Sequence, residues 1–199
     1  MEWFMRFGDV PGIEYPVPAG VDPRKLKGYG LMPKIRRRED LPPSLMWDSD
    51  GDGYGDSASP AHERAFMDLR EKSVKVIRRN LVEALELPGI VTDYHFAIQS
   101  ACEELWRRRL ENPQYLTELE IWCRLDLALL KARPHEFQYE RDGELSYYLI
   151  RAFGYLRSLY EKEGALLEAL EIAEEESRFN PNEKQLEQLR ERVRAEAED

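Results

Sequence analysis

Apolar residues recur at three- and four-residue spacing along most of the chain after residue 59, which is typical of helices that bury one face. Ser59-Pro60 joins a good N-cap to a good first helical residue, and we expect one helix from there to Pro88-Gly89. Thr92 is expected to cap a second helix. Asn112-Pro113 repeats the cap-and-proline device and opens a third helix, which stops at Pro134.

The same periodicity predicts three more helices in the last third of the chain. A polar loop around Arg141-Asp142-Gly143 precedes the fourth, which is expected to begin near Leu145. Gly164 turns the chain into the fifth, and Asn180-Pro181 opens the sixth. No strand pattern is evident after residue 58. The pattern therefore predicts an all-α fold of about six helices, arranged as antiparallel helical hairpins.

Prolines break the helical period before residue 60. Eight of the 12 prolines lie in residues 1–60: Pro11, Pro16, Pro18, Pro23, Pro33, Pro42, Pro43 and Pro60. We therefore predict an extended arm with turns over residues 1–58 and a helical domain over residues 59–199. Trp3, Phe4 and Phe7 make the arm too apolar for a free tail, so it is expected to pack on the helical body or on a partner.

Composition narrows the class of protein. A hydrophobic content of 42% supports a packed core, and a net charge of −10 argues against a protein built mainly to coat nucleic acid. The chain has only two cysteines, Cys102 and Cys123, which excludes a disulfide scaffold and a cysteine zinc site. The first residues do not resemble a secretory signal, and no apolar run reaches the length of a membrane span. We therefore expect a cytoplasmic protein with no membrane partner.

The two cysteines also test the arrangement of the second and third helices. If Asn112-Pro113 turns an antiparallel hairpin, residues at the same level have numbers that sum to about 225, twice the turn position. Cys102 and Cys123 satisfy that sum. We therefore expect both at the seam between the helices, as reduced thiols.

Residues 144–199 carry a family resemblance. Tyr160, Gly164, Ala169 and Asn180-Pro181 stand where the tetratricopeptide repeat places a tyrosine, a turn glycine, a small alanine and the start of the next unit. Gly164 permits a tight turn, and Ala169 allows two helices to approach closely. This segment therefore resembles a tetratricopeptide-like helical hairpin.

The resemblance is degenerate, and an irregular helical bundle is the alternative. Arg157 and Glu176 stand where the repeat has small residues. The resemblance implies binding of a protein or peptide partner on a concave surface rather than chemistry. The residues expected to serve that contact are Arg124, Tyr147, Tyr148, Arg151 and Tyr155.

Carboxylates at alternate positions make the sharpest local motif. The expected metal ligands are Asp48, Asp50, Asp52, Tyr54 and Asp56. Alternate carboxylates followed by glycine resemble the start of an EF-hand loop, and more closely the short Asp-Gly calcium loops of extracellular modules. The closing glutamate is missing, so calcium affinity is expected to be weak, on the order of 10⁻⁴ to 10⁻³ M. The alternative is a flexible linker between arm and body.

A basic segment supplies the second candidate surface. It has seven basic residues and no acidic ones: Arg24, Lys25, Lys27, Lys34, Arg36, Arg37 and Arg38. Such a segment can bind nucleic acid, or it can neutralise acidic helices of the same chain or of a neighbouring subunit. The second interpretation agrees better with the net charge, and it allows self-association through the arm.

No catalytic constellation is present. His62, His95 and His135 lack metal-ligand spacing and are expected to be caps or surface residues, and no phosphate loop or nucleophile elbow occurs. A metal-dependent enzyme is therefore only a minor alternative. The sequence predicts a non-enzymatic protein–protein interaction or scaffold protein, with a nucleic-acid-associated protein as the main alternative.

Overall fold

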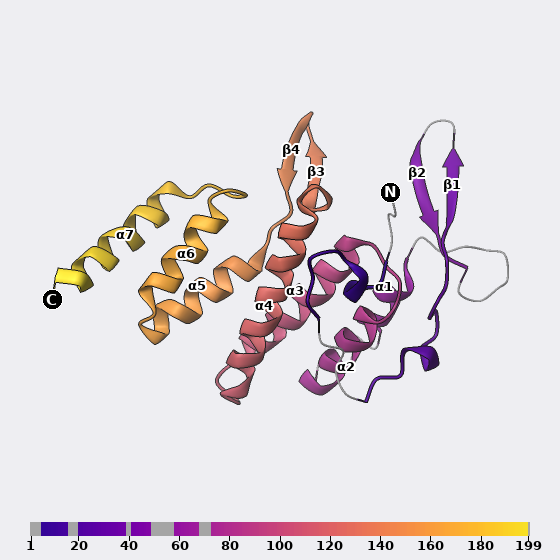
Figure 1. Cartoon of the computed structure of the whole chain (residues 1–199), viewed down its shortest axis with the longest axis horizontal. Helices are drawn as coiled ribbons and strands as arrows, with labels where there is room; N and C mark the ends of the chain where they lie inside the picture. The colour runs from indigo at the N-terminus through magenta and orange to yellow at the C-terminus, as the bar shows by residue number, and fades with distance from the viewer. Residues whose placement is uncertain (1–4, 16–19, 39–40, 49–57, 68–72, 199) are drawn as a thin grey trace. The chain divides into compact units, whose positions relative to one another are not determined.

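The fold of this 199-residue chain, in a computed structural model, is mostly α-helical, as expected. The structure describes residues 5–15, 20–38, 41–48, 58–67 and 73–198. These residues form seven α-helices, three short 3₁₀ turns and two small antiparallel sheets (Figure 1). Among the described helices, none combines the length and the apolar character that a membrane crossing requires.

The helices and strands follow one another along the chain in this order. The helices are α1 (Pro60–Ala65), α2 (Val74–Leu85), α3 (Val91–Arg107), α4 (Gln114–Ala132), α5 (Arg151–Glu163), α6 (Leu166–Glu176) and α7 (Glu183–Glu198). The strands are β1 (Lys34–Arg38) with β2 (Leu41–Met46), and β3 (Gln138–Arg141) with β4 (Glu144–Tyr147). The 3₁₀ turns are η1 (Phe7–Asp9), η2 (Pro23–Lys25) and η3 (Pro134–Phe137).

The chain divides into two compact units. Unit 1 comprises Met1–Ala101 and Ala128–Glu136, and unit 2 comprises Cys102–Leu127 and Phe137–Asp199. The division falls within α3 and α4, so each unit uses part of both helices. Each unit is described by itself below.

The first described stretch of the N-terminal arm, residues 5–15, packs into the core of unit 1. Phe7 and Val10 are buried, and the Phe7 ring meets Tyr94 of α3 edge-on, with 5.5 Å between ring centroids. The backbone of Met5 exchanges hydrogen bonds of 3.0 and 3.1 Å with Gly89. The Tyr94 hydroxyl contacts the backbone carbonyl of Met5 as well. These contacts agree with the expectation for Phe7, whereas Trp3 and Phe4 lie outside the described residues.

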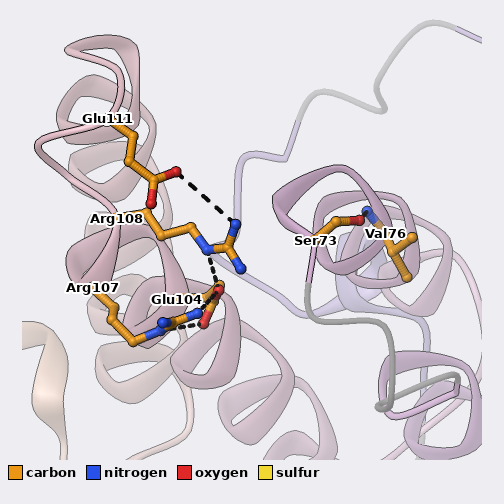
Figure 2. Close-up of polar contacts among 6 residues, drawn as sticks. All are labelled: Ser73, Val76, Glu104, Arg107, Arg108 and Glu111. Carbon is orange, nitrogen blue, oxygen red and sulfur yellow. Dashed lines mark hydrogen bonds and ion pairs between the residues drawn. The ribbon is translucent and has the colours of Figure 1, made fainter.

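The single helix expected between Ser59 and Pro88 is wrong, because two helices occupy that stretch. Ser59 does cap α1, since its hydroxyl accepts a hydrogen bond of 3.0 Å from the His62 amide. The helix α1 ends at Ala65, and α2 begins only at Val74. Ser73 is the N-cap of α2, accepting from the Val76 amide (Figure 2). Ser73, which the single expected helix would place in its interior, is therefore a capping residue.

The start of α3 also differs from the expectation. The helix begins at Val91, so Thr92 lies inside it and is not the cap. Asp93 serves this helix start instead, because its carboxylate accepts hydrogen bonds from the Ile90 amide at 3.0 Å and from the Ser59 hydroxyl at 2.6 Å. Asn112 does cap α4 as expected, accepting from the Gln114 amide at 3.0 Å.

The helix expected to begin near Leu145 is wrong, because the chain forms a β-hairpin there and α5 begins at Arg151. Asp142 has φ 55° and Gly143 has φ 82°. Positive φ at both central residues is the requirement of a type I′ turn, and Asp-Gly is one of its preferred sequences. The turn sets the register in which Arg141 pairs with Glu144. Turn chemistry thus overrides the apolar periodicity at Leu145.

A second hairpin lies in the arm, where no strand was expected. In β1 and β2, Lys34 pairs with Met46 and Ile35 pairs with Leu45. Pro43 lies in β2 and has no amide hydrogen to donate, which is tolerated because β2 is an edge strand. Both strands of this two-stranded sheet have one edge without a neighbouring strand among the described residues.

In unit 2, α5, α6 and α7 pack in sequence order, α5 against α6 and α6 against α7 (Figure 1). Gly164 ends α5 with φ 76°, a left-handed conformation that glycine adopts without steric cost. The amides of Gly164 and Ala165 both donate to the carbonyl of Tyr160. Leu156 and Ala169 are fully buried in the core of this unit.

Candidate partner-binding surfaces

An aromatic pocket in unit 2 is the first candidate site. It has a volume of about 470 Å³ and is formed by the β3–β4 hairpin, the start of α5 and the end of α6 with the turn that follows. We call it the aromatic pocket. Its lining residues are Tyr139, Leu145, Ser146, Tyr147, Tyr148, Leu149, Ile150, Phe153, Glu176, Phe179 and Asn180.

The rings of this pocket are fixed by contacts with one another. Tyr139 stacks on Tyr148 with 5.1 Å between ring centroids, and Phe153 stacks on Phe179 at 5.9 Å. Tyr147 meets Phe179 edge-on at 5.2 Å. Such arrangements are the favourable ones for aromatic pairs, so the pocket wall is held in place before any partner arrives.

Two large aliphatic side chains at this pocket are exposed to water. Leu145 is 72% exposed and Leu149 is 64% exposed. Burying apolar surface gains roughly 25 cal/mol per Å², so covering these two side chains would favour a complex. The pocket therefore suits an apolar side chain, with Leu145 and Leu149 adding apolar contact area beside it.

The structure brings only two of the five predicted partner-binding residues into this pocket. Tyr147 and Tyr148 line it, whereas Arg151, Tyr155 and Arg124 lie elsewhere in unit 2. Arg151 is the first residue of α5 and forms an ion pair of 2.8 Å with Glu103. The Tyr155 ring packs on Trp106 at 5.4 Å, and burial raises the pKa of its hydroxyl.

Arg124 belongs to a polar triad between α4 and α5. Its guanidinium donates hydrogen bonds to Glu120 at 3.0 Å and to the Tyr160 hydroxyl at 2.6 Å. The Tyr160 hydroxyl in turn donates to Glu120 at 2.6 Å, and this bond lowers the pKa of that carboxyl. Burial raises the pKa of Tyr160 to about 12, so the hydroxyl stays a donor at neutral pH. Arg124 and Tyr160 therefore tie α5 to α4.

The C-terminal end of α3 carries a second charged cluster. Glu104 accepts hydrogen bonds from Arg107 and Arg108, and the same Arg108 reaches Glu111 at 4.0 Å (Figure 2). The bond from Arg107 is the main cause that holds the pKa of the Glu104 carboxyl below its ordinary value. Nearby, Arg109 lies over the ring of Trp106 at 4.4 Å. These arginines serve specific contacts as well as the helix dipole.

A larger pocket in unit 1 was not expected from the sequence. It has a volume of about 840 Å³. It is lined by Met5, Arg6, Asp9, Pro11, Tyr29, Gly30, Leu31, Met32, Pro88, Ala132, Arg133, Pro134, His135 and Glu136. The charged groups at its wall are already paired, Arg6 with Asp9 at 2.8 Å and Arg133 with Glu136. Four separate segments build it, so the sequence carries no local signal for this pocket beyond the two i,i+3 ion pairs.

The basic segment is not one continuous patch. Arg24 and Lys25, in η2, lie 2.9 and 4.0 Å from Asp22, and Lys34 lies 3.7 Å from Asp48. Lys27 follows η2, and Arg38 ends β1. The side chains of Arg36 and Arg37 are exposed on β1. Arg24, Lys25 and Lys27 are exposed too, so the exposed cations are divided between η2 with the residues after it and strand β1.

The predicted calcium loop falls almost entirely outside the described residues. Asp48 is described and faces Lys34, whereas Asp50, Asp52, Tyr54 and Asp56 lie outside them. Within the ranges that the structure describes, no group of three or more acidic, histidine or cysteine side chains is arranged to hold a metal. The calcium loop therefore stays a prediction.

The histidines and cysteines are placed as follows. His95 is fully buried in α3, so its assignment as a cap or surface residue is wrong. Cys102 and Cys123 are both buried, with 3.6 Å between their sulfur atoms and no disulfide. This proximity confirms the predicted register of the two cysteines. Burial raises the pKa of the Cys102 thiol well above its ordinary value.

Comparisons of the chain with protein-family models, with curated proteins and with solved structures found no match. Function is therefore inferred from the residues and geometry of the chain itself.

Proposed function

We propose that this chain is a non-enzymatic protein-interaction or scaffold protein, and that its aromatic pocket receives an apolar side chain from an extended segment of a partner. The observation that carries the proposal is the exposure of Leu145 and Leu149 beside a pocket walled by stacked rings. Concave apolar sites with a few polar groups are the usual form of binding sites.

The β3–β4 hairpin explains why an extended segment is favoured over a helix. Each strand has one edge without a neighbouring strand within the described part of the chain. Such an edge accepts an added strand through main-chain hydrogen bonds, while pockets for alternate side chains provide specificity. Tyr147 lies in β4 and also lines the pocket, so an added strand would lie next to it.

The charge of the hairpin selects among such segments. Residues 138–147 contain Glu140, Asp142 and Glu144 against Arg141, three negative charges and one positive, a net charge of −2. Opposite charges on neighbouring strands attract, and like charges repel. The favoured partner segment therefore combines apolar residues with basic ones.

The tetratricopeptide-like resemblance of residues 144–199 supports the same class of function. Gly164 has a left-handed conformation and Ala169 is fully buried, which supports the proposal that they act as the turn glycine and the small alanine of such a repeat. Helical arrays of this kind bind peptides and proteins on their concave surface. The proposal treats α5 and α6 as one degenerate unit of this type.

A random peptide library displayed on phage and selected on the full-length chain tests the proposal. We expect enrichment of extended, apolar-and-basic sequences, and at least about tenfold weaker binding to the Leu145→Glu, Leu149→Glu variant, which corresponds to about 1.4 kcal/mol. Leu167→Glu is the matched control, because Leu167 is 64% exposed on α6 and does not line the pocket. Equal binding to all three proteins would contradict the proposal.

The exposed Arg36 and Arg37 keep nucleic-acid binding as a second candidate function. The salt dependence of binding distinguishes the two candidate functions, because phosphate contacts weaken steeply as the salt concentration rises whereas apolar contacts do not. We expect no binding of a random-sequence oligonucleotide at physiological salt. Tight oligonucleotide binding with a steep salt dependence, lost in Arg36→Glu with Arg37→Glu, would favour the second function.

A further inference from the structure

We propose that the partner segment is strand β1 of a second copy of this chain, which adds to the β3–β4 hairpin and places Ile35 at its aromatic pocket. This inference rests on the proposed function, because it uses the same pocket and the same strand edges. It names the occupant as the chain itself. Three observations carry it.

Both hairpins are incomplete as sheets. Among the described residues, β1 pairs only with β2 and β3 pairs only with β4 (Figure 1). An isolated two-stranded hairpin is marginally stable in water, and three or more strands are needed for a stable sheet. Joining the two hairpins would give a four-stranded sheet and satisfy one free edge of each.

The two hairpins carry opposite charge. Strand β1 contains Lys34, Arg36, Arg37 and Arg38, four positive charges and no negative one, while residues 138–147 have a net charge of −2. Arg36, Arg37, Glu140 and Glu144 are all exposed. Attraction between a basic strand and an acidic one speeds their encounter. It also favours a strand pairing that places opposite charges next to each other.

The apolar positions match as well. In β1, Ile35 is 55% exposed and stands between Lys34 and Arg36. In the acceptor hairpin, the exposed Leu145 follows Glu144 in β4 and pairs across the sheet with Glu140. Because successive residues of a strand point to opposite faces, Ile35 can meet Leu145 on one face of the sheet while Lys34 and Arg36 meet Glu144 on the other.

The geometry has a consequence for assembly. The donor strand β1 and the acceptor hairpin are different surfaces of one chain, so the contact is head-to-tail rather than two-fold symmetric. Such a contact leaves one donor and one acceptor open after each addition. It therefore builds closed rings or open chains, and the mean mass rises with concentration.

Sedimentation of the full-length chain over a wide concentration range tests this inference. We expect the mean mass to rise with concentration at low salt and the rise to weaken at high salt. Arg36→Glu with Arg37→Glu reverses the charge of these two positions in the donor strand β1. Glu140→Lys with Glu144→Lys does the same in the acceptor hairpin β3–β4. Each double variant alone should self-associate at least about tenfold more weakly.

Charge complementation between the two double variants is the decisive experiment. An equimolar mixture of the donor and acceptor variants should associate, because each supplies the surface that the other has lost. A chain with all four changes should self-associate again, which also shows that the individual changes leave the fold intact. Lys75→Glu with Arg79→Glu on α2 is the matched control for net charge, and it should leave self-association unchanged.

Three results would overturn the inference. The chain could stay monomeric at every concentration, the donor variant could associate like the unmodified chain, or the mixture could fail to associate. If the unmodified chain is monomeric while library peptides still need Leu145 and Leu149, the pocket binds a different partner and only this inference fails. If Arg36→Glu with Arg37→Glu abolishes only oligonucleotide binding, β1 is a nucleic-acid contact and not a donor strand.

Discussion

Glu104 shows how a single buried carboxylate organises the C-terminal end of α3. Its side chain is nearly buried, yet it receives hydrogen bonds from two guanidinium groups, those of Arg107 and Arg108. These bonds stabilise the charged form and hold the pKa of this carboxyl below its ordinary value. The contribution to folding is therefore present above the unfolded pKa and is lost as the pH falls through the lower folded pKa.

Replacing Glu104 should make this contribution measurable. We expect Glu104→Gln to lower the free energy of unfolding by about 1–3 kcal/mol at neutral pH, the usual range for charge-assisted hydrogen bonds. The difference from the unmodified protein should be smaller at an acidic pH below the ordinary pKa of a glutamate, because protonation of the folded carboxyl removes the charge that these bonds stabilise. Urea unfolding at both pH values measures it. Glu111→Gln is the control, since that residue is exposed and its loss should cost almost nothing.

The two cysteines make a prediction about accessibility. Both are buried at the seam where α3 meets α4 within unit 2, and burial raises the pKa of the Cys102 thiol. Only the thiolate reacts readily, so labelling by an aromatic disulfide reagent should be slow in the native protein and fast in denaturant. Rapid labelling of both thiols under native conditions would contradict the observed placement of these two residues.

The carboxylate loop makes a metal-binding prediction that depends on sequence alone. We expect calorimetry to show weak calcium binding, on the order of 10⁻⁴ to 10⁻³ M, that Asp50→Ala with Asp52→Ala abolishes. Glu168→Ala with Glu171→Ala removes two exposed carboxylates of α6 and should leave the heat unchanged. No heat at millimolar calcium would identify residues 48–56 as a linker.

Among the secondary-structure elements, sequence patterns located the helices better than the strands. Helix starts at Ser59 and Asn112 were predictable because a side-chain cap followed by proline is a local signal. Ser73 was missed as a cap because the single helix expected from Ser59 to Pro88 placed it in a helix interior. The β3–β4 hairpin was missed even though Asp142-Gly143 is a type I′ turn sequence, because the apolar spacing after it also fits a helix.

Replacement of glycine by alanine can be compared at two positions, one inside α5 and one in the turn that ends it. Gly164 has φ 76°, where an alanine costs roughly 1–2 kcal/mol, so Gly164→Ala should lower the melting temperature. Gly154 lies inside α5 with open space at its Cβ position, so Gly154→Ala should stabilise the protein by roughly 0.5–1 kcal/mol. Thermal unfolding of both variants measures the opposite signs. A stabilised Gly164→Ala protein would contradict the role of this turn.

For the whole molecule, the candidate site illustrates what one sequence can and cannot predict. Tyr147 and Tyr148 were expected to contact a partner because aromatic side chains in repeat arrays often do; both line the aromatic pocket, and the contact itself stays a prediction. Phe179 was not expected, because it joins the pocket through the turn after α6. A pocket built from three segments has no local pattern, and neither has the larger pocket of unit 1, which Met5 and His135 both line.

The N-terminal arm supports the last prediction, because unit 1 uses it as part of its core. Phe7 is fully buried against Tyr94 and Tyr15, while Glu14 is exposed on the same arm. Phe7→Ala should lower the free energy of unfolding by about 3–5 kcal/mol through lost burial and the cavity left behind. Glu14→Ala should change it by less than about 0.5 kcal/mol.

Deletion of residues 1–20 extends this test from one side chain to the first part of the arm. The truncated protein loses the Met5–Gly89 backbone pair as well as Phe7 and Val10, so it should melt at a lower temperature than the full-length chain. Differential scanning calorimetry and sedimentation of both proteins measure the effect. If the two melt and sediment alike, the arm does not contribute to the core. That result would mean that the burial of Phe7 adds nothing to the free energy of unfolding. We expect the opposite, because exposing a large aromatic side chain to water is unfavourable.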